Sequence, residues 1–519
     1  MAISSDQYDC PLESMSCQKL DLLVSGGGIV GAGVARDAAM RGLRVGLVEQ
    51  HDFASGTSSR SSRLLHGGIR YLAQARIGLV REANREKTVI NRIAPHLSQP
   101  LPFVFPTRRG TPWSRWKLGI GVKLYDMLCG PDKLGRSRGL NIGQTLEMLP
   151  GLSRTDLTGA VRYFDGLTND ARLVIDTLRS AVHHGAIVCN YVRFAGASCK
   201  QGTWRCTLVD ARTGRETEVL TRAVVNATGP WSDRLPFAGT SLRLTKGVHL
   251  VVDRQRFPVP EAVVMAEGKR ILFAIPWGQR VILGTTDTDY DGPLESPTCD
   301  ADDIRYVLET VNTTFPEAKL GETDILSTWA GLRPLVADRR GNPSDISRRH
   351  EITMNHDGWW DVTGGKLTTY RLMAEETINK IVAYLGVSTP RCSTAAVPLL
   401  ENGEVGEFSG ILPPPVSRSA VEHYCRREWA RHLDDVMFRR TSWRHYNTDH
   451  LAIAEKVAGW MAELLGWSKQ ETEEQLADYR RMAVGPGASG ALSAPRTRPV
   501  AEITRVPSPV ERSATVTRT

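Results

Sequence analysis

The sequence predicts an α/β protein in which a parallel βαβ unit, an antiparallel β-sheet and a C-terminal group of helices are combined. Three observations predict this fold class. Residues 20–49 contain a short apolar strand, a glycine-rich turn, a helix and a second strand. Segments of alternating β-type residues lie between about 244 and 290, and residues 417–482 have a helical pattern.

The composition is that of an ordinary globular protein with several domains. At roughly 150 residues per domain, 519 residues suggest two to four domains. Hydrophobic residues make up 41% and charged residues 24%, which excludes a mainly disordered, collagen-like or small disulfide-stapled protein. The net charge of +8 is mild, and no aromatic–basic cluster accompanies it, so we expect no nucleic-acid partner.

Cysteine usage and the N-terminus indicate a cytoplasmic protein. Nine cysteines, an odd number with no Cys-x-x-Cys spacing, predict reduced thiols and no metal site. The first 17 residues lack the apolar core of a signal peptide. No run of 18 apolar residues occurs, so we expect no transmembrane helix.

The glycine-rich turn predicts a dinucleotide site. Gly26 permits a tight turn, Gly28 lets the backbone approach a pyrophosphate, and Gly31 lets the helix pack closely on the sheet. The helix N-terminus then faces the phosphates. Glu49 ends the second strand 18 residues later, where its carboxylate can accept ribose hydroxyl groups. The unit is therefore Rossmann-like.

Two further segments favour FAD over NAD. An apolar strand at residues 222–226 ends in Ala227, Thr228 and Gly229, as in flavoproteins whose strand returns beside the dinucleotide. Gly364 and Gly365 precede a helix, where backbone N–H groups could bind flavin oxygen or phosphate. The loop at 51–73 adds possible hydroxyl donors, although a solvated turn remains an alternative, at Thr57, Ser58, Ser59 and Ser62.

The remaining elements follow in order along the chain. Helices are expected at 79–94, 113–130 and 170–185, with an extended, proline-rich segment at 95–112. Strands are expected near 186–225, and further helices begin near Asp302 and at Gly364.

We divide the chain into a flexible leader (1–19), an oxidoreductase region (20–390), a linker (391–416), a C-terminal helical domain (417–483) and a disordered tail (484–519). The expected cofactor-binding domain is discontinuous, at about 20–75, 155–233 and 325–390. The substrate or cap portions are expected at about 76–154 and 234–324.

Six segments in order resemble one protein family. They are DFASGTSSRSSRLLHGGIRYL (52–72), NATGPW (226–231), KGVHLVV (246–252), GTTDTDY (284–290), GLRPL (331–335) and GGKLTTYR (364–371). Together they resemble the FAD-dependent sn-glycerol-3-phosphate dehydrogenases, within the D-amino-acid-oxidase-like flavoproteins. The resemblance covers roughly residues 20–390 and resumes at 432–443.

The resemblance implies a reaction and a location. FAD takes a hydride from C2 of glycerol 3-phosphate to give dihydroxyacetone phosphate, and the electrons pass to a membrane quinone. The enzyme is then peripheral, on the inner face of the cell membrane. The oligomeric state stays open, a homodimer included.

The resemblance also implies site residues. Arg333 and Arg348 match substrate arginines, which suit a phosphate dianion, and Arg349 is the alternative to Arg348. His66, His249, Arg333 and Lys366 are the catalytic candidates, and Lys366 could also bind substrate; the sequence does not choose the base. The further cofactor contacts implied are His66, Gly67, Gly68, Gly331, Leu332, Gly365, Lys366, Leu367 and Thr368.

Residues 113–130 could contact an anionic lipid surface. Trp113, Trp116, Ile120, Leu124 and Met127 recur at helical spacing, and Arg115, Lys117 and Lys123 add positive charge. The alternative is an ordinary domain helix packed on the core.

Two other functions remain open at this point. The same fold could oxidise an amine or a 2-hydroxy acid with oxygen as acceptor. Alternatively, a flavin-binding scaffold without activity could recruit partners through its basic tail. The cluster of Asp434, Asp435, Arg439 and Arg440 is expected to be a structural ion-pair network.

Overall fold

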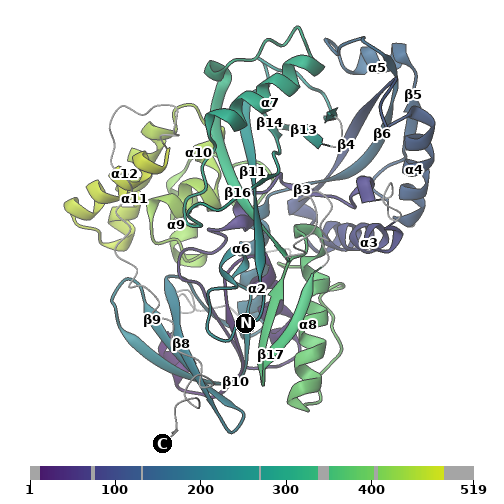
Figure 1. Cartoon of the computed structure of the whole chain (residues 1–519). Coiled ribbons are helices and arrows are strands. Elements are labelled where there is room, and N and C mark those ends of the chain that lie inside the picture. The colour runs from purple at the N-terminus through teal and green to yellow at the C-terminus, as the bar shows by residue number, and fades with distance from the viewer. Residues whose placement is uncertain are drawn as a thin grey trace, which may run out of the picture.

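Figure 1 shows the computed structural model, in which two sheets lie one above the other and C-terminal helices flank them. The structure describes residues 12–71, 76–129, 133–267, 270–336, 350–401 and 407–483. Arg348 and the tail from residue 484 fall outside these residues. Within them, no helix is long and apolar enough to cross a membrane.

The first sheet contains the βαβ unit at its centre. Its strand order is β17-β18-β10-β1-β2-β7, and β9 and β8 extend it from β10. β18, β10, β1, β2 and β7 run parallel and are largely apolar, as expected for strands covered on both faces. The bounds are β1 (Leu20–Ser25), β2 (Val45–Val48), β7 (Ile187–Cys189), β8 (Val192–Lys200), β9 (Thr203–Asp210), β10 (Glu216–Asn226), β17 (Glu351–His356) and β18 (Trp359–Thr363).

Three long helices pack together on this sheet. α2 lies beside both α6 and α8, and their apolar side chains share one core with the central strands. Gly33 permits the close contact of α2 with Tyr370 of α8, because a Cβ there would lie 3.0 Å from the tyrosine ring. The bounds are α2 (Ile29–Met40), α6 (Asp170–His183) and α8 (Tyr370–Leu385).

The second sheet is mostly antiparallel. Its order is β15-β11-β14-β13-β12-β4-β6-β3, with β16 on β11 and β5 on β6; β12 and β4 are the one parallel pair among the described strands of this sheet. The bounds are β3 (Leu64–Leu65), β4 (Ser98–Arg108), β5 (Arg138–Leu140), β6 (Leu157–Thr168), β11 (Leu242–Asp253), β12 (Ala262–Glu267), β13 (Arg270–Trp277), β14 (Arg280–Gly284), β15 (Thr288–Asp289) and β16 (Ile325–Val336).

Helices cover the second sheet and its edge. α7 contacts β11 and β12, whereas α4 and α5 contact β6. Asp300 and Asn141 cap α7 and α5, each in a reciprocal capping box, which fixes where these helices begin. The bounds are α3 (Ile77–Ile93), α4 (Arg115–Leu128), α5 (Ile142–Met148) and α7 (Ala301–Thr314).

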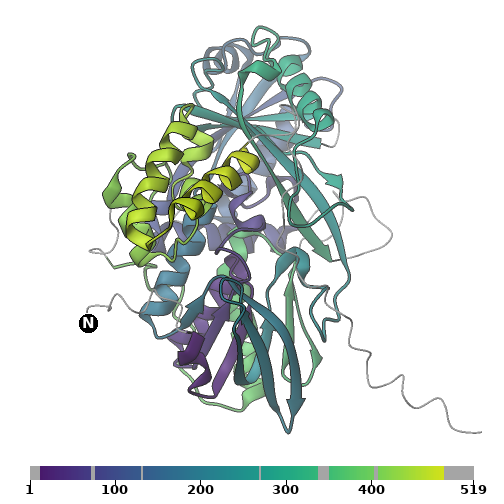
Figure 2. The same ribbon diagram turned by 90° about the vertical axis from the view of Figure 1, so that its left-hand side faces the viewer.

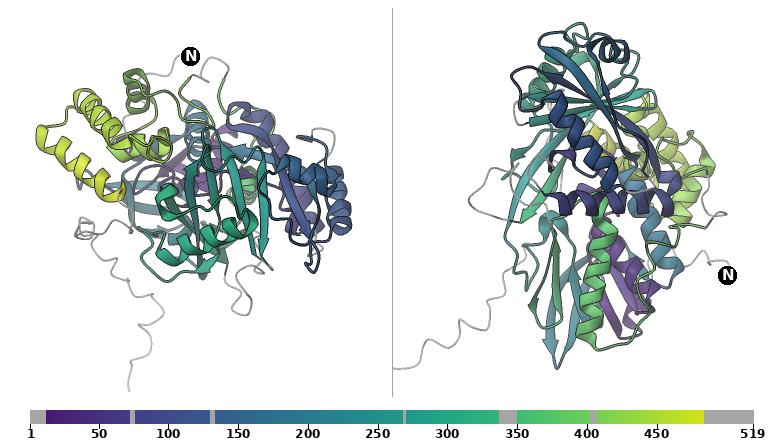
Figure 3. Two further views of the ribbon diagram at one scale, coloured as in Figure 1. Left: turned by 90° about the horizontal axis from the view of Figure 1, so that it is seen from above. Right: turned by 90° about the vertical axis from the view of Figure 1, so that its right-hand side faces the viewer.

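The C-terminal helices form a separate core, as predicted. They are α9 (Arg418–Arg427), a π-helical segment η8 (Asp435–Arg440), α10 (Trp443–Tyr446), α11 (His450–Leu465) and α12 (Lys469–Ala483). Figure 2 shows this group packed against the flank of the molecule, and Figure 3 shows α4 on the opposite side.

Three predicted boundaries were wrong. β6 and β16 belong to the second sheet rather than to the cofactor-binding domain, because their hydrogen-bond partners are β4 and β11, which the local sequence does not specify. Residues 12–16 of the predicted leader form helix α1 (Leu12–Ser16), whose Met15 is buried beside β1. The helix expected at Gly364 begins later, with η7 (Leu367–Thr369), because Gly364 and Gly365 have positive φ.

Part of the predicted linker is also packed. Leu399 and Leu400 fill the first core, and the buried Arg36 donates hydrogen bonds to the carbonyls of Thr394 and Val397 at 3.2 and 2.8 Å. These contacts tie residues 394–400 to α2.

Candidate active site

The glycine-rich turn between β1 and α2 accepts only glycine at two positions. Gly26 has φ +113°, and a Cβ there would lie 2.5 Å from the carbonyl oxygen of Ala227. A Cβ on Gly31 would lie 1.9 Å from the carbonyl oxygen of Gly26. The predicted roles in a tight turn and in close packing of α2 are therefore consistent with the geometry.

Polar groups converge on this turn. Glu49 at the end of β2 accepts the backbone N–H of Gly27 at 2.7 Å and that of His51 at 2.9 Å. Its carboxylate has further lone pairs for hydroxyl donors. The hydroxyl oxygen of Ser58 accepts the N–H of Ile29, in the first turn of α2, at 3.0 Å. Loop residue Ser58 is thereby fixed at the helix N-terminus.

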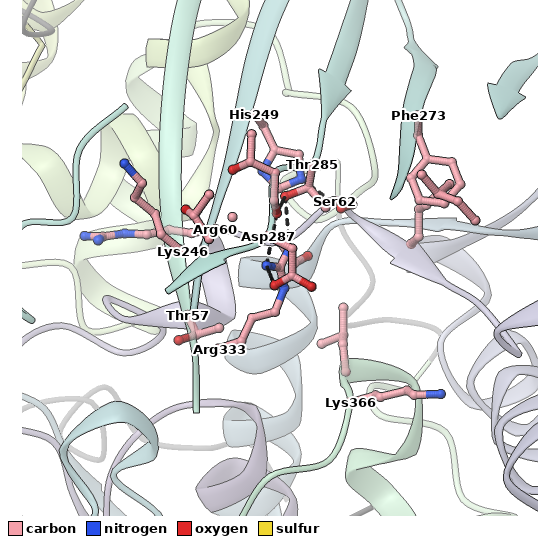
Figure 4. Close-up of a pocket in the computed structure, with 18 of the residues that line it drawn as sticks. Thr57, Arg60, Ser62, Lys246, His249, Phe273, Thr285, Asp287, Arg333 and Lys366 are labelled. Atoms are coloured by element: carbon pink, nitrogen blue, oxygen red, sulfur yellow. Dashed lines mark hydrogen bonds and ion pairs between the residues drawn. The ribbon is translucent and has the colours of Figure 1, made fainter. Parts of the chain in front are cut away.

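A cavity of about 1090 Å³ lies between the two sheets and extends from this turn. Figure 4 shows its central polar side chains. The cavity brings together most of the side chains that the sequence singled out. They are Thr57, Ser58, Ser62, His66, His249, Arg333, Lys366, Leu367 and Thr368, with the backbone of Gly68, Gly331 and Gly365.

Other predicted residues do not line this cavity. They are Gly26, Gly28, Gly31, Glu49, Ser59, Gly67, Ala227, Thr228, Gly229, Leu332 and Gly364. Several of them surround the first turn of α2, at the carboxyl ends of β1, β2 and β10. This is where a dinucleotide binds in parallel α/β sheets.

His249 on β11 is buried in the cavity wall. Its Nε2 lies 2.8 Å from the hydroxyl oxygen of Ser62, and its ring stacks on Trp329 at 5.2 Å between centroids. Burial, and then the charges of Arg333 and Arg63, lower its pKa to about 3. The imidazole is therefore neutral at physiological pH.

Arg333 on β16 is held by three groups of one turn. Its guanidinium donates to the hydroxyl of Thr285 at 2.9 Å, the carbonyl of Thr286 at 3.1 Å and the carboxylate of Asp287 at 3.0 Å. Gly247 leaves room for it, because a Cβ there would lie 2.3 Å from the arginine Nη2. The arginine is only 22% exposed.

Lys366 lies at the opposite side of the cavity, next to the turn at His66–Gly68. Its Nζ is 4.2 Å from the centre of the Tyr71 ring. The hydroxyl of Thr368 accepts the N–H of His66 at 3.1 Å, which joins this turn to η7. The glycines allow both backbones to approach, since Gly68 and Gly365 have positive φ.

A buried network supports the His66–Gly68 turn from behind. Gly67 donates its N–H to the phenol oxygen of Tyr125 at 2.7 Å, and Tyr125 donates to Asp165 at 2.5 Å. Lys87 also donates to Asp165, at 2.7 Å. Tyr125 belongs to α4, so this helix touches the cavity wall. The local sequence does not reveal this network, because the residues that each of these hydrogen bonds joins are 40 to 98 positions apart in the chain.

Two features of the cavity lining are not among the residues predicted from the sequence. Arg60 and Lys246 contribute cations, and Lys246 pairs with Asp300 and Asp303 at 2.6 Å each. The other end is apolar and is lined by Phe103, Tyr163, Phe273, Phe105, Val264 and Ile271. The basic residues among the serines of 57–63 were a signal in the sequence from which Arg60 could have been predicted. The aromatic end gave no such signal, because its residues come from four different strands.

The chain belongs to the family described as FAD dependent oxidoreductase, which matches residues 21–377. The C-terminal domain of alpha-glycerophosphate oxidase matches residues 412–472. FAD is thus the cofactor, and the two glycine positions and the polar groups at the first turn of α2 fit its pyrophosphate and ribose.

Named relatives extend over most of the chain. A glycerol-3-phosphate dehydrogenase of Mycobacterium leprae is 35% identical, with 92% of this chain and 90% of that protein covered. An aerobic glycerol-3-phosphate dehydrogenase of Staphylococcus saprophyticus is 37% identical, with 78% and 75% covered. The structure of the Bacillus halodurans glycerol-3-phosphate dehydrogenase, solved with FAD, has a TM-score of 0.75 at 30% identity, with 92% and 97% covered.

Proposed function

We propose that the protein oxidises sn-glycerol 3-phosphate to dihydroxyacetone phosphate and transfers the electrons to a membrane quinone. Bound FAD supplies the hydride acceptor for C2 of the substrate. The single observation that carries the proposal is the preorganised Arg333 in the same cavity as His66, His249 and Lys366. The named relatives agree with this substrate.

Arg333 supplies the anchor for the substrate phosphate in this proposal. A guanidinium can bind a phosphate through two parallel hydrogen bonds, and Asp287 and Thr285 fix its plane before substrate arrives. Lys366 adds a positive charge on the opposite side of the cavity. Arg348, which is not among the described residues, stays a proposed second anchor for the substrate phosphate.

Oxidation at C2 also requires a group that takes the hydroxyl proton. His66 and His249 both line the cavity. His249 is neutral, and a phosphate dianion on Arg333 would offset the positive charge that depresses its pKa, which makes the ring a better proton acceptor. We therefore propose His249 as the base, with Ser62 holding its ring orientation at 2.8 Å.

The aromatic end of the cavity suits the proposed quinone. Phe103 stacks on Tyr163 at 5.3 Å and meets the edge of Phe273 at 5.9 Å. A planar, apolar ring fits such a lining better than it fits the cationic end. Trp113, next to α4, packs on Phe105 at 5.5 Å, so this end adjoins the surface that we propose faces lipid.

That surface is the outer face of α4. Leu118, Val122 and Tyr125 are buried, whereas Trp116, Ile120 and Met127 are 66%, 63% and 70% exposed. Arg115 and Lys117 are exposed as well, and the Nζ of Lys117 lies 5.7 Å from the centre of the Trp116 ring. Exposed apolar residues flanked by cations suit an anionic lipid surface, and we propose peripheral attachment to the inner face of the cell membrane.

The substrate proposal is tested by anaerobic stopped-flow absorbance. Mixing FAD-loaded protein with glycerol 3-phosphate should bleach the flavin band, and a quinone analogue should restore it. Glycine, sarcosine and lactate serve as comparison substrates. Reduction by one of these instead, with peroxide release in air, would replace the proposal by an amine or hydroxy-acid oxidase. Absence of reduction by any of them would favour a flavin-binding scaffold.

The base is tested by His249→Asn and His66→Asn. The first variant should slow flavin reduction by about 100-fold or more, in line with general-base catalysis, while FAD binding persists. A larger loss in His66→Asn than in His249→Asn would assign the base to His66.

A further inference from the structure

Arg60 lies in the loop that joins the dinucleotide turn to the catalytic candidates. Before it, Thr57 donates to the carbonyl of Leu332 at 2.6 Å, and Ser58 contacts the first turn of α2. After it, Ser62 contacts His249. The backbone of Arg60 packs on β16, because a Cβ on Gly331 would lie 2.8 Å from its carbonyl oxygen. The loop is thus held in place before and after Arg60, and Arg60 lines the cavity between these contacts.

The charge of Arg60 is not compensated. Its guanidinium makes no ion pair or hydrogen bond with the residues that the structure describes, whereas Arg333 pairs with Asp287 and Lys246 pairs with two aspartates. Desolvation, and then the second cation Arg439, lower the pKa of Arg60 to about 10. Figure 4 shows Arg60 and Lys246 on the same side of the cavity, away from Lys366.

An uncompensated cation in a partly buried position raises the free energy of the folded protein. A ligand that supplies the opposite charge would remove this cost. Two molecules that carry phosphate are in question: FAD, whose expected pyrophosphate site at the first turn of α2 adjoins the cavity at Ile29 and Ser58, and, under the proposed function, the substrate. Both phosphates accept the two parallel hydrogen bonds that an arginine offers.

We propose that Arg60 binds a phosphate group in the cavity, as a further anchor beside Arg333. For the substrate as source, this rests on the proposed function; for the cofactor pyrophosphate it does not. In both cases, the group that pairs with the guanidinium is a multiply charged phosphate. A sulfonate or carboxylate of lower charge should bind more weakly at the same position.

The variants Arg60→Gln and Arg60→Lys test the proposal, with Arg81→Gln, at an exposed position of α3, as matched control. In one arm, FAD is titrated into the FAD-free full-length protein and its dissociation constant is measured from flavin fluorescence. In the other arm, inorganic phosphate and glycerol 3-phosphate are titrated into the FAD-loaded protein, and binding is followed by the flavin absorbance spectrum.

Arg60→Gln should weaken one of these bindings by about 10-fold to 100-fold, as expected for the loss of a charge-assisted pair, and Arg60→Lys should recover part of it. Weaker FAD binding alone assigns Arg60 to the pyrophosphate. Weaker phosphate and glycerol 3-phosphate binding alone assigns it to the substrate. Affinities within twofold of the Arg81→Gln control in both arms would overturn the proposal.

The melting temperature of the ligand-free protein distinguishes the loss of a ligand contact from a general loss of stability. If Arg60 awaits an anion, ligand-free Arg60→Gln should melt at the same or a higher temperature than wild type. FAD or phosphate should then raise its melting temperature less than that of wild type. A ligand-free variant that melts lower, with unchanged ligand affinities, would make Arg60 a structural residue. A wild-type protein that ignores glycerol 3-phosphate would refute the proposed function but leave the FAD and phosphate arms informative.

Discussion

At the scale of single residues, Arg333 is already held in place for the phosphate that we propose it binds. Its partner Asp287 holds the guanidinium in place at 3.0 Å, and β16 and the 285–287 turn fix both ends of the pair. A ligand phosphate would therefore meet an arginine that has little side-chain freedom left to lose.

Replacement of Arg333 by alanine should weaken glycerol 3-phosphate binding by about 30-fold to 100-fold, since a hydrogen bond to a charged group contributes about 2–3 kcal/mol. FAD content should be unchanged. The measurement is the substrate dependence of flavin reduction in anaerobic stopped flow. Asp287→Asn is the companion variant and should have a smaller effect, because the arginine remains. Equal binding by wild type and Arg333→Ala would remove this residue as the anchor.

Several residues that line the cavity were named from the sequence, and their roles stay proposals. Arg333, His249, Lys366 and the serines of 57–62 could be named because each stands in a short motif that the family resemblance carries. The pairing of Ser62 with His249 could not be predicted, since 187 residues separate them and only the approach of the loop to β11 joins them.

At the scale of elements, α4 has two faces with different tasks. Its inner face holds the His66–Gly68 turn through Tyr125, and its outer face exposes Trp116, Ile120 and Met127. The predicted apolar stripe included Trp113, which instead packs half-buried on Phe105 just before the helix begins. Trp116 and Ile120 are therefore better sites for testing lipid contact than Trp113.

The double variant Trp116→Glu/Ile120→Glu should lose most binding to anionic liposomes in a flotation assay, because it removes apolar area and adds negative charge to the proposed contact. Leu451→Glu on α11 is the matched control, as this leucine is 46% exposed on the other side of the molecule. Flotation of a folded double variant at the wild-type level would exclude this face as the anchor.

At the scale of the whole molecule, a buried ion network joins the C-terminal helices to the loop that follows β2. The carboxylate of Asp52 accepts hydrogen bonds from Arg439 at 2.5 Å and from Arg440 at 2.7 and 2.8 Å. Burial alone would raise the pKa of Asp52, but Arg440 and Arg439 lower it to about 2. The ion-pair role predicted for the 434–440 cluster is confirmed, and the network extends to the loop that carries Thr57 and Ser58.

Asp52→Asn should lower the free energy of unfolding by about 3–5 kcal/mol, because it leaves two buried arginines without this partner. It should also weaken FAD retention, since the loop loses its support. Asp21→Asn, which breaks the half-exposed pair with Arg44, should cost about 1 kcal/mol or less. Urea unfolding and flavin release report both quantities. Equal losses in the two variants would contradict a special role for the network.

Acid should destabilise the fold before the carboxylates titrate. The folded-state pKa of His249 is about 3, below its ordinary value of 6.5, so its contribution to stability is complete above pH 6.5 and is lost as the pH falls toward 3. At pH 5 this one group should cost about 2 kcal/mol. Urea unfolding at pH 7 and pH 5 measures the effect. A His249→Asn variant with the same pH dependence as wild type would assign it to other groups.

The sequence by itself determined the local elements and the cofactor turn. Glycine spacing, apolar strands and the position of Glu49 are properties of neighbouring residues, so the βαβ unit, α7 and the C-terminal helices could be predicted. The tertiary structure decided which sheet β6 and β16 join. It also formed the aromatic end of the cavity and the buried ion pairs of Asp52 with Arg439 and Arg440. These depend on contacts between distant segments, and strand pairing and ion pairing of that kind leave no periodic signal in the chain.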